Sequence, residues 1–239
     1  MLFRAVYFDC DSTLATIEGV DELIDAIDPG LRVELAELTE RAMNGQVPLA
    51  EVYETRLARI APRRDLLHRV GELYVQNEVP HARDVVQALR ASGKHVGIIS
   101  GGLLLPVRML ARDLGIPEVN VHAVPLEFTA SGDYVDFDRR SPLWQNGGKV
   151  EVLLGLPAEH RPVAFVGDGA TDLETQMDGA DLFVGFGGVA AREIVRSNAE
   201  AWVPGPSLAG VLRHVLTAGE RARLRSQPRF SELLSAAEE

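Results

Sequence analysis

Cysteine and lysine are the two residue types that this chain nearly lacks. Cys10 is the single cysteine among 239 residues, which excludes an internal disulfide framework and any zinc site built from several thiolates. Lys94 and Lys149 are the only lysines among 24 Lys and Arg residues. A lysine beside a recognisable motif therefore merits attention.

Long apolar runs and an excess of positive charge are also missing. No run approaches the roughly twenty apolar residues needed to span a bilayer, and the first ten residues lack the apolar core and cleavage site of a signal peptide. The formal net charge is -11, whereas nucleic acids and anionic lipids attract cationic surfaces. We therefore expect a soluble, cytoplasmic protein with neither a nucleic acid nor a membrane as partner.

Short apolar runs typical of strands alternate with segments of helical periodicity along most of the chain. The strand-like runs cover residues 3–8, 95–100, 119–124, 162–166, 181–184 and 201–203. Two of the helical segments end at Gly93 and Gly115, as helix C-termini commonly do. This alternation predicts an α/β fold with a parallel sheet covered on both faces, and sites at the carboxyl ends of its strands.

Two intervals interrupt the alternation and suggest how the domains are organised. Residues 15–76 carry only helical signals, so we expect a helical cap domain inserted after the first strand. Residues 125–138 alternate around a Ser-Gly-Asp turn and predict a small β-hairpin insertion. The α/β core domain would comprise residues 1–14 and 77–216, and residues 217–239 would form a C-terminal helical tail to which the sequence assigns no role.

Four carboxylates follow two of the predicted strands. Asp9 and Asp11 lie in VYFDCDSTL, and Asp168 and Asp172 lie in VAFVGDGATD. If the two strands are neighbours, the four groups meet at one edge of the sheet, where their mutual repulsion calls for a cation. Hard oxygen ligands with no histidine near them favour Mg²⁺.

A serine, two glycines and a lysine mark a place for a phosphoryl group. Ser100, Gly101 and Gly102 end a predicted strand, where N–H groups at a helix N-terminus can receive an anion, and Lys149 follows Gly-Gly at the start of another helix. Each motif alone is common in turns and on surfaces, but their ordered combination indicates a phosphoryl cradle facing a metal and a nucleophile. A P-loop is unlikely since no Gly-x-x-x-x-Gly-Lys-Ser/Thr occurs, and GFGG lacks the third glycine of a dinucleotide fingerprint.

In order along the chain, DCDST, SGG, Lys149 and GDGATD resemble the four motifs of the haloacid dehalogenase superfamily of phosphatases. The segments DSTLATIEGVDEL, RAMNGQVP, ISGG, GGK and GFGG extend the resemblance to the branch that acts on O-phospho-L-serine. It spans about residues 3 to 205 and leaves the tail unmatched. The resemblance implies a Rossmann-like core with an inserted helical cap.

The resemblance also implies catalytic roles. Asp9 would be the nucleophile that forms an aspartyl-phosphate, and Asp11 would act first as general acid and then as general base. Ser100 and Lys149 would help Mg²⁺ to stabilise the charge of the transferring phosphoryl group.

For the metal, the resemblance implies that Mg²⁺ is bound by the Asp9 side chain, the Asp11 backbone carbonyl and Asp168. Asp172 would stand behind these ligands and orient Lys149. One carboxylate would then attack, another would shuttle a proton, and the metal would make their closeness tolerable.

Substrate choice is expected to depend on the helical insertion. The resemblance implies that Glu18 recognises the ammonium group of the substrate serine and that Arg56 recognises its carboxylate, which an arginine fork matches well. The remaining residues assigned to substrate binding are Met43, Gly101, Gly102 and Thr171. The positions that depart from relatives, and that bear on pocket shape, are Thr16, Asn44 and Leu49.

Three hypotheses follow for the function. The first is a Mg²⁺-dependent phosphatase that converts O-phospho-L-serine to L-serine and phosphate in serine biosynthesis, as a monomer or homodimer. The second keeps the chemistry but takes another small phosphomonoester, such as phosphoethanolamine or phosphohomoserine, or transfers the phosphoryl group to a second alcohol. The third is a phosphometabolite sensor without turnover.

Overall fold

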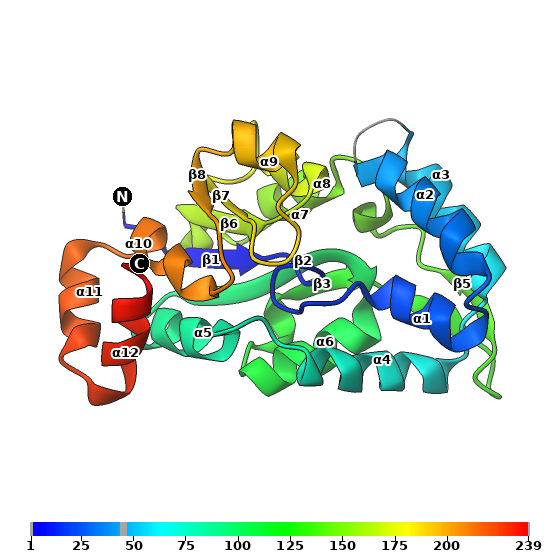
Figure 1. The fold of residues 1–239 in the computed structure, drawn as a ribbon, viewed down its shortest axis with the longest axis horizontal. Helices are drawn as coiled ribbons and strands as arrows, with labels where there is room; N and C mark the ends of the chain where they lie inside the picture. The colour runs from blue at the N-terminus through cyan, green and yellow to red at the C-terminus, as the bar shows by residue number, and fades with distance from the viewer. Residues whose placement is uncertain (1, 44–46, 239) are drawn as a thin grey trace.

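A six-stranded parallel sheet forms the centre of the molecule in this computed structural model, which describes residues 2–43 and 47–238. In spatial order the strands are β3 (Val121–Val124), β2 (His95–Leu103), β1 (Ala5–Phe8), β6 (Val163–Gly167), β7 (Leu182–Phe186) and β8 (Ala201–Val203). All residues of β1 and β6 are buried, because helices cover both faces of the sheet (Figure 1). The predicted α/β fold is confirmed.

Helices of the core lie on opposite faces of this sheet (Figure 1). One face is covered by α5 (Ala82–Ala91) and α6 (Leu104–Leu114), and the other by α7 (Gly148–Leu154), α8 (Ala170–Leu173) and α9 (Glu193–Asn198). Short 3₁₀ turns are η1 (Glu118–Asn120), η2 (Pro142–Trp144), η3 (Ala158–His160), η4 (Glu174–Gln176) and η5 (Leu208–Val211). Gly115 ends α6 with a φ of 78°, a left-handed conformation that glycine adopts without strain.

In the described part of the chain, four helices lie between β1 and α5. They are α1 (Gly19–Ile27), α2 (Leu31–Met43), α3 (Leu49–Ile60) and α4 (Arg64–Gln76). The first three gather beyond one end of the sheet, whereas α4 runs along α6 and joins this group to the core (Figure 1). None of the helices described in the structure is long and apolar enough to cross a membrane.

The predicted hairpin is present as antiparallel β4 (Leu126–Phe128) and β5 (Tyr134–Phe137). It contacts the helical insertion at several points. The ring of Phe137 packs edge-on against Tyr53 of α3 with centroids 5.3 Å apart, and the Arg139 guanidinium pairs with Glu54. The hairpin and the residues that follow it therefore connect the core to α3.

The last described residues, 217–238, pack onto the core. They contain α11 (Ala218–Arg225) and α12 (Pro228–Ala236), which follow α10 (Leu212–Val215), and α12 contacts α5. Thr217 and Glu220 form a capping box at the start of α11. Glu220 also accepts a hydrogen bond from the buried ammonium of Lys94, at 2.7 Å, and Lys94 donates to the Phe3 carbonyl at 2.7 Å. The tail is thus tied to the first residue before β2 by a buried ion pair.

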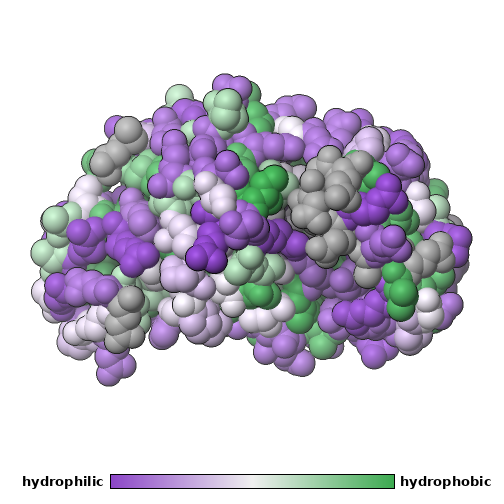
Figure 2. Space-filling view, turned by 45° about the horizontal axis from the view of Figure 1, so that its top comes forward, coloured by the Kyte–Doolittle hydropathy of each residue, from purple (hydrophilic) through white to green (hydrophobic). Residues whose placement is uncertain are grey.

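The surface is mostly polar. On the face drawn in Figure 2, hydrophilic residues predominate and hydrophobic ones are scattered among them. The exposed large apolar side chains come from several different elements and include Val33, Val119, Leu154 and Met177. Scattered exposure of this kind is normal for a globular domain.

Candidate active site

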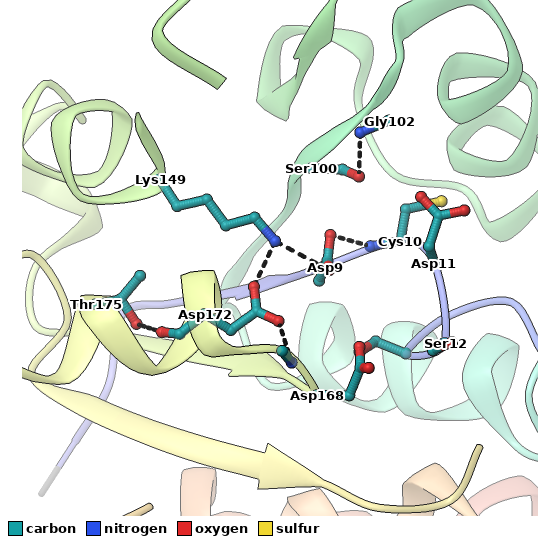
Figure 3. Close-up of polar contacts among 12 residues, drawn as sticks. Asp9, Cys10, Asp11, Ser12, Ser100, Gly102, Lys149, Asp168, Asp172 and Thr175 are labelled. Carbon is teal, nitrogen blue, oxygen red and sulfur yellow. Dashed lines mark hydrogen bonds and ion pairs between the residues drawn. The ribbon is translucent and has the colours of Figure 1, made fainter. Parts of the chain in front are cut away.

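The predicted carboxylates converge because their strands are neighbours. β1 pairs with β2 on one side and with β6 on the other, all in parallel. Asp9 follows β1, Asp168 follows β6, and Ser100 lies within β2, so their side chains meet at one edge of the sheet (Figure 3). The amide of Asp9 donates to the Val166 carbonyl at 2.9 Å. The hydrogen bonding between β1 and β6 thus extends one residue beyond β1, as far as Asp9.

Lys149 connects Asp9 with Asp172 (Figure 3). Its ammonium lies 2.9 Å from Asp9 Oδ2 and donates to Asp172 Oδ1. The other Asp172 oxygen accepts from the Gly169 amide at 2.8 Å. Burial alone would lower the pKa of Lys149, but the adjacent Asp172 and Asp9 outweigh it and raise that pKa above its usual value. Lys149 is therefore a permanent positive charge beside the proposed nucleophile.

Asp9, Asp168 and Asp172 form an acidic cluster that could hold a cation. One carboxylate oxygen from each lies within 4.8 Å of the others. Burial, followed by the charges of Asp172 and Asp9, raises the pKa of Asp168 well above its usual value. Such crowding of anions is relieved when a hard divalent cation binds, and carboxylate oxygens are its preferred ligands. The donor set fits Mg²⁺.

Asp11 faces the helical insertion. Its Oδ1 accepts hydrogen bonds from the Tyr74 hydroxyl and the Gly19 amide, both at 2.6 Å. Burial and the charges of Glu18 and Asp9 raise the pKa of Asp11 to about 8, although its two hydrogen bonds act in the opposite direction. The raised pKa favours the protonated form of this carboxyl group, which is the state a general acid requires.

The Ser100-Gly101-Gly102 segment corrects one detail of the prediction. It lies inside β2, which continues to Leu103, and α6 begins at Leu104. The glycines are therefore strand residues that precede the helix. A register shift between β2 and β3 accompanies this longer strand. At Gly102 a Cβ would lie 3.0 Å from Asp11 Oδ2 and 3.2 Å from Ser100 Oγ, so glycine keeps the space between these groups open.

Glu18 and Arg56 also face this site. Glu18 Oε1 accepts a hydrogen bond from the Ser12 hydroxyl at 2.6 Å, and Ser12 has a left-handed φ of 53°, an uncommon conformation for a residue with a side chain. Arg56 Nη2 pairs with Asp21 of α1. Both residues come from the helical insertion, although 38 positions separate them.

One pocket brings most of the predicted residues together. The predicted residues that line it are Asp9, Asp11, Glu18, Arg56, Ser100, Gly101, Gly102, Lys149, Asp168, Thr171 and Asp172. Met43 is the last residue of α2, but its side chain lies outside the described part of the structure, as do residues 44–46.

The sequence analysis missed three residues of this site. Arg192 Nε lies 3.2 Å from Asp168 Oδ2, and its Nη2 lies 3.9 Å from Glu18. Tyr74 donates to Asp11, and Tyr53 lines the pocket next to Arg56. The GFGG turn, four residues before Arg192, was the available signal for the first. No sequence motif marks the two tyrosines.

The site and the fold define a class of hydrolase. The model of the haloacid dehalogenase-like hydrolase family matches residues 3–175, and the chain belongs to that family.

The relatives that this chain resembles within the family include phosphoserine phosphatases. The mouse phosphoserine phosphatase is 37% identical over 201 residues, which is 83% of this chain and 88% of the mouse protein. A solved phosphoserine phosphohydrolase-like protein from Francisella tularensis has a TM-score of 0.80 at 22% identity, covering 89% of this chain and 100% of that one. A phospho-aspartyl intermediate analogue of phosphoserine phosphatase has a TM-score of 0.72 at 23% identity, covering 90% and 100%. These two structures establish the fold.

Proposed function

We propose that this chain is a Mg²⁺-dependent phosphatase that hydrolyses O-phospho-L-serine to L-serine and phosphate, in the last step of serine biosynthesis. The observation that carries the proposal is the arrangement of Asp9, Lys149 and Asp11 in one pocket. It combines a carboxylate that is paired with an ammonium group and a carboxyl group whose raised pKa favours its protonated form. The identity to the mouse phosphoserine phosphatase supports the choice of substrate.

In the first half-reaction, an Asp9 carboxylate oxygen attacks phosphorus and the bond from phosphorus to the serine oxygen breaks. Asp11 donates its proton to the departing alkoxide, so that L-serine leaves as a neutral alcohol. Lys149 and Ser100 stabilise the oxygens of the phosphoryl group during transfer. This electrostatic contribution is large because uncatalysed hydrolysis of phosphate monoesters is among the slowest of reactions.

In the second half-reaction, water attacks the phosphorus of the aspartyl-phosphate. Asp11, now a carboxylate, takes a proton from that water as the bond from phosphorus to Asp9 breaks. Phosphate leaves and both carboxyl groups return to their starting states. Splitting the hydrolysis in this way lets a fixed carboxylate make the first attack.

Asp9, the Asp11 carbonyl and Asp168 would bind Mg²⁺, with Asp172 behind them holding Lys149. When bound, the ion supplies positive charge to the phosphoryl oxygens and cancels the repulsion among the carboxylates. The carboxylate oxygens of Asp9 and Asp168 that lie within 4.8 Å of each other support their part in this assignment.

Residues 15–76 would act as a cap that selects the substrate. Glu18 would receive the ammonium group and Arg56 the carboxylate of phosphoserine. Closure of the cap would exclude bulk water from the aspartyl-phosphate. The other residues proposed to contact substrate are Met43, Gly101, Gly102 and Thr171.

Phosphate release from four compounds tests the proposal. With Mg²⁺ present, we expect a clear preference for L-phosphoserine over phosphoethanolamine, phosphohomoserine and 3-phosphoglycerate, and no release after treatment with a chelator. Adding Mg²⁺ back should restore the activity. Preference for another compound would overturn the substrate, whereas absence of turnover on all four would favour a sensor or an untested substrate.

Replacing Arg56 with alanine is expected to raise KM for L-phosphoserine by about 10- to 100-fold, because a hydrogen bond to a charged group contributes about 1.5–3 kcal/mol. KM for phosphoethanolamine should stay unchanged because that compound has no carboxylate. Steady-state kinetics of both compounds measure the difference, and Arg223→Ala on the exposed face of α11 is the control. Equal losses on both compounds would contradict the proposed role.

A further inference from the structure

Two buried polar atoms of α3 have no hydrogen-bond partner. Among the described residues, the buried side-chain nitrogens and oxygens left unpaired are the Tyr53 hydroxyl oxygen and Arg56 Nε. Buried polar groups are normally paired, and leaving one unpaired costs free energy. Two such atoms on one helix are therefore not engaged by described protein groups and are open to pair with a ligand that enters the site.

The two atoms come from one face of α3. Tyr53 and Arg56 are three positions apart, a spacing that places side chains next to each other on a helix. Both residues line the pocket that contains Asp9 and Lys149. Tyr53 is only 8% exposed, and its ring is fixed by the edge-on contact with Phe137. The hydroxyl is therefore held in place before any ligand arrives.

Because of Asp21, Arg56 alone has fewer donors to offer to a substrate carboxylate. The Asp21 carboxylate pairs with Arg56 Nη2, so part of the guanidinium charge is already balanced and one of its nitrogens is engaged. A substrate carboxylate must use the donors that remain, of which Arg56 Nε is unpaired. A neutral O–H from the same face of α3 adds a second hydrogen bond without adding a charge to be desolvated.

We infer that the Tyr53 hydroxyl is a specificity-determining donor, which binds the carboxylate of the substrate together with Arg56 Nε. The inference rests on the proposed function, because L-phosphoserine supplies that carboxylate. Burial raises the pKa of Tyr53 above its usual value, so the hydroxyl keeps its proton and is available to donate.

Tyr53→Phe tests this inference because it removes only the hydroxyl and keeps the ring against Phe137. We expect KM for L-phosphoserine to rise about tenfold, as for a lost hydrogen bond to a charged group, with kcat nearly unchanged. KM for phosphoethanolamine should not change. Tyr134→Phe is the matched control: Tyr134 lies on the neighbouring hairpin and is not among the residues lining the pocket.

A second measurement does not depend on catalysis. No described protein group pairs with this hydroxyl, so we expect Tyr53→Phe to have a higher melting temperature than wild type in the absence of ligand. Saturating L-serine should then raise the melting temperature of Tyr53→Phe by less than it raises that of wild type. Wild type and Tyr134→Phe should show the full rise.

The outcomes separate the two proposals. If wild type hydrolyses L-phosphoserine and Tyr53→Phe leaves its KM unchanged or lowers it, the role of Tyr53 is overturned and the proposed function stands. An equal rise of KM for both compounds would assign Tyr53 to packing and also overturn its role. If wild type does not act on L-phosphoserine, the proposed function fails and the inference fails with it.

Discussion

Asp9→Asn is expected to lower phosphate release from L-phosphoserine by on the order of ten-thousand-fold or more, because an amide cannot replace the carboxylate that we propose as the nucleophile. Two contacts fix the position of the Asp9 carboxylate. Its Oδ1 accepts from the Cys10 amide at 2.7 Å and its Oδ2 lies 2.9 Å from the Lys149 ammonium. Asparagine has nearly the same shape, so the loss should appear in kcat with the fold intact.

Phosphate release under single-turnover and steady-state conditions measures this effect. Asp178→Asn removes an exposed carboxylate next to η4 and is the matched control, for which we expect unchanged kinetics. A rate within tenfold of wild type for Asp9→Asn would show that the reaction does not pass through Asp9. Circular dichroism should report the same helix content for both variants.

Glu220→Gln is expected to lower the free energy of unfolding by about 3 kcal/mol or more, since it leaves the Lys94 ammonium buried without a counter-charge. The two side chains are 3% and 2% exposed. For a protein of this size the loss corresponds to a fall of roughly 6–12 °C in melting temperature. Glu232→Gln on the exposed face of α12 is the control, and urea unfolding measures both.

The loss should depend on pH. Burial alone would raise the pKa of Glu220. Hydrogen bonds from Lys94 and Thr217 outweigh burial and lower that pKa below its usual 4.5. A carboxylate with a lowered pKa contributes its stability fully above pH 4.5 and loses it as the pH falls through the folded-state value. The difference between wild type and Glu220→Gln should therefore be largest near neutral pH and shrink below pH 4.5. A difference independent of pH would contradict the ion pair as its cause.

Adding Lys94→Met to Glu220→Gln should recover part of the lost stability, because the double variant has no unpaired buried charge. A double variant that is less stable by the sum of the two single losses would show that the residues do not interact.

The sequence predicted the parts of this molecule that depend on local pattern. The strand runs, the helix ends at Gly93 and Gly115 and the order of the four motifs can each be recognised within a few residues, and parallel pairing then brings Asp9 and Asp168 to one edge. The sequence pattern underestimates the length of β2, because it indicates a strand that ends at Ser100, whereas the strand continues to Leu103.

Contacts between distant segments could not be predicted in this way. Thr217 and Glu220 have the spacing of a capping box, but the pairing of Glu220 with Lys94 spans 126 positions. Arg192 reaches Asp168 only because β6 and β7 are adjacent and the chain after β7 turns back over their ends. From the sequence alone, Tyr53 could equally be an ordinary apolar-face residue of α3, whereas the structure packs its ring against Phe137 at the pocket.

The burial of both lysines determines how the molecule responds to amine-directed chemistry. Lys94 and Lys149 are 6% and 7% exposed, so the positive charge on the surface belongs to arginine, which acylating reagents do not modify. Acylation of Lys149 would require the pocket to open, and acylation of Lys94 would require α11 to move away from Lys94. The extent of labelling at each lysine thus distinguishes opening of the site from release of the tail.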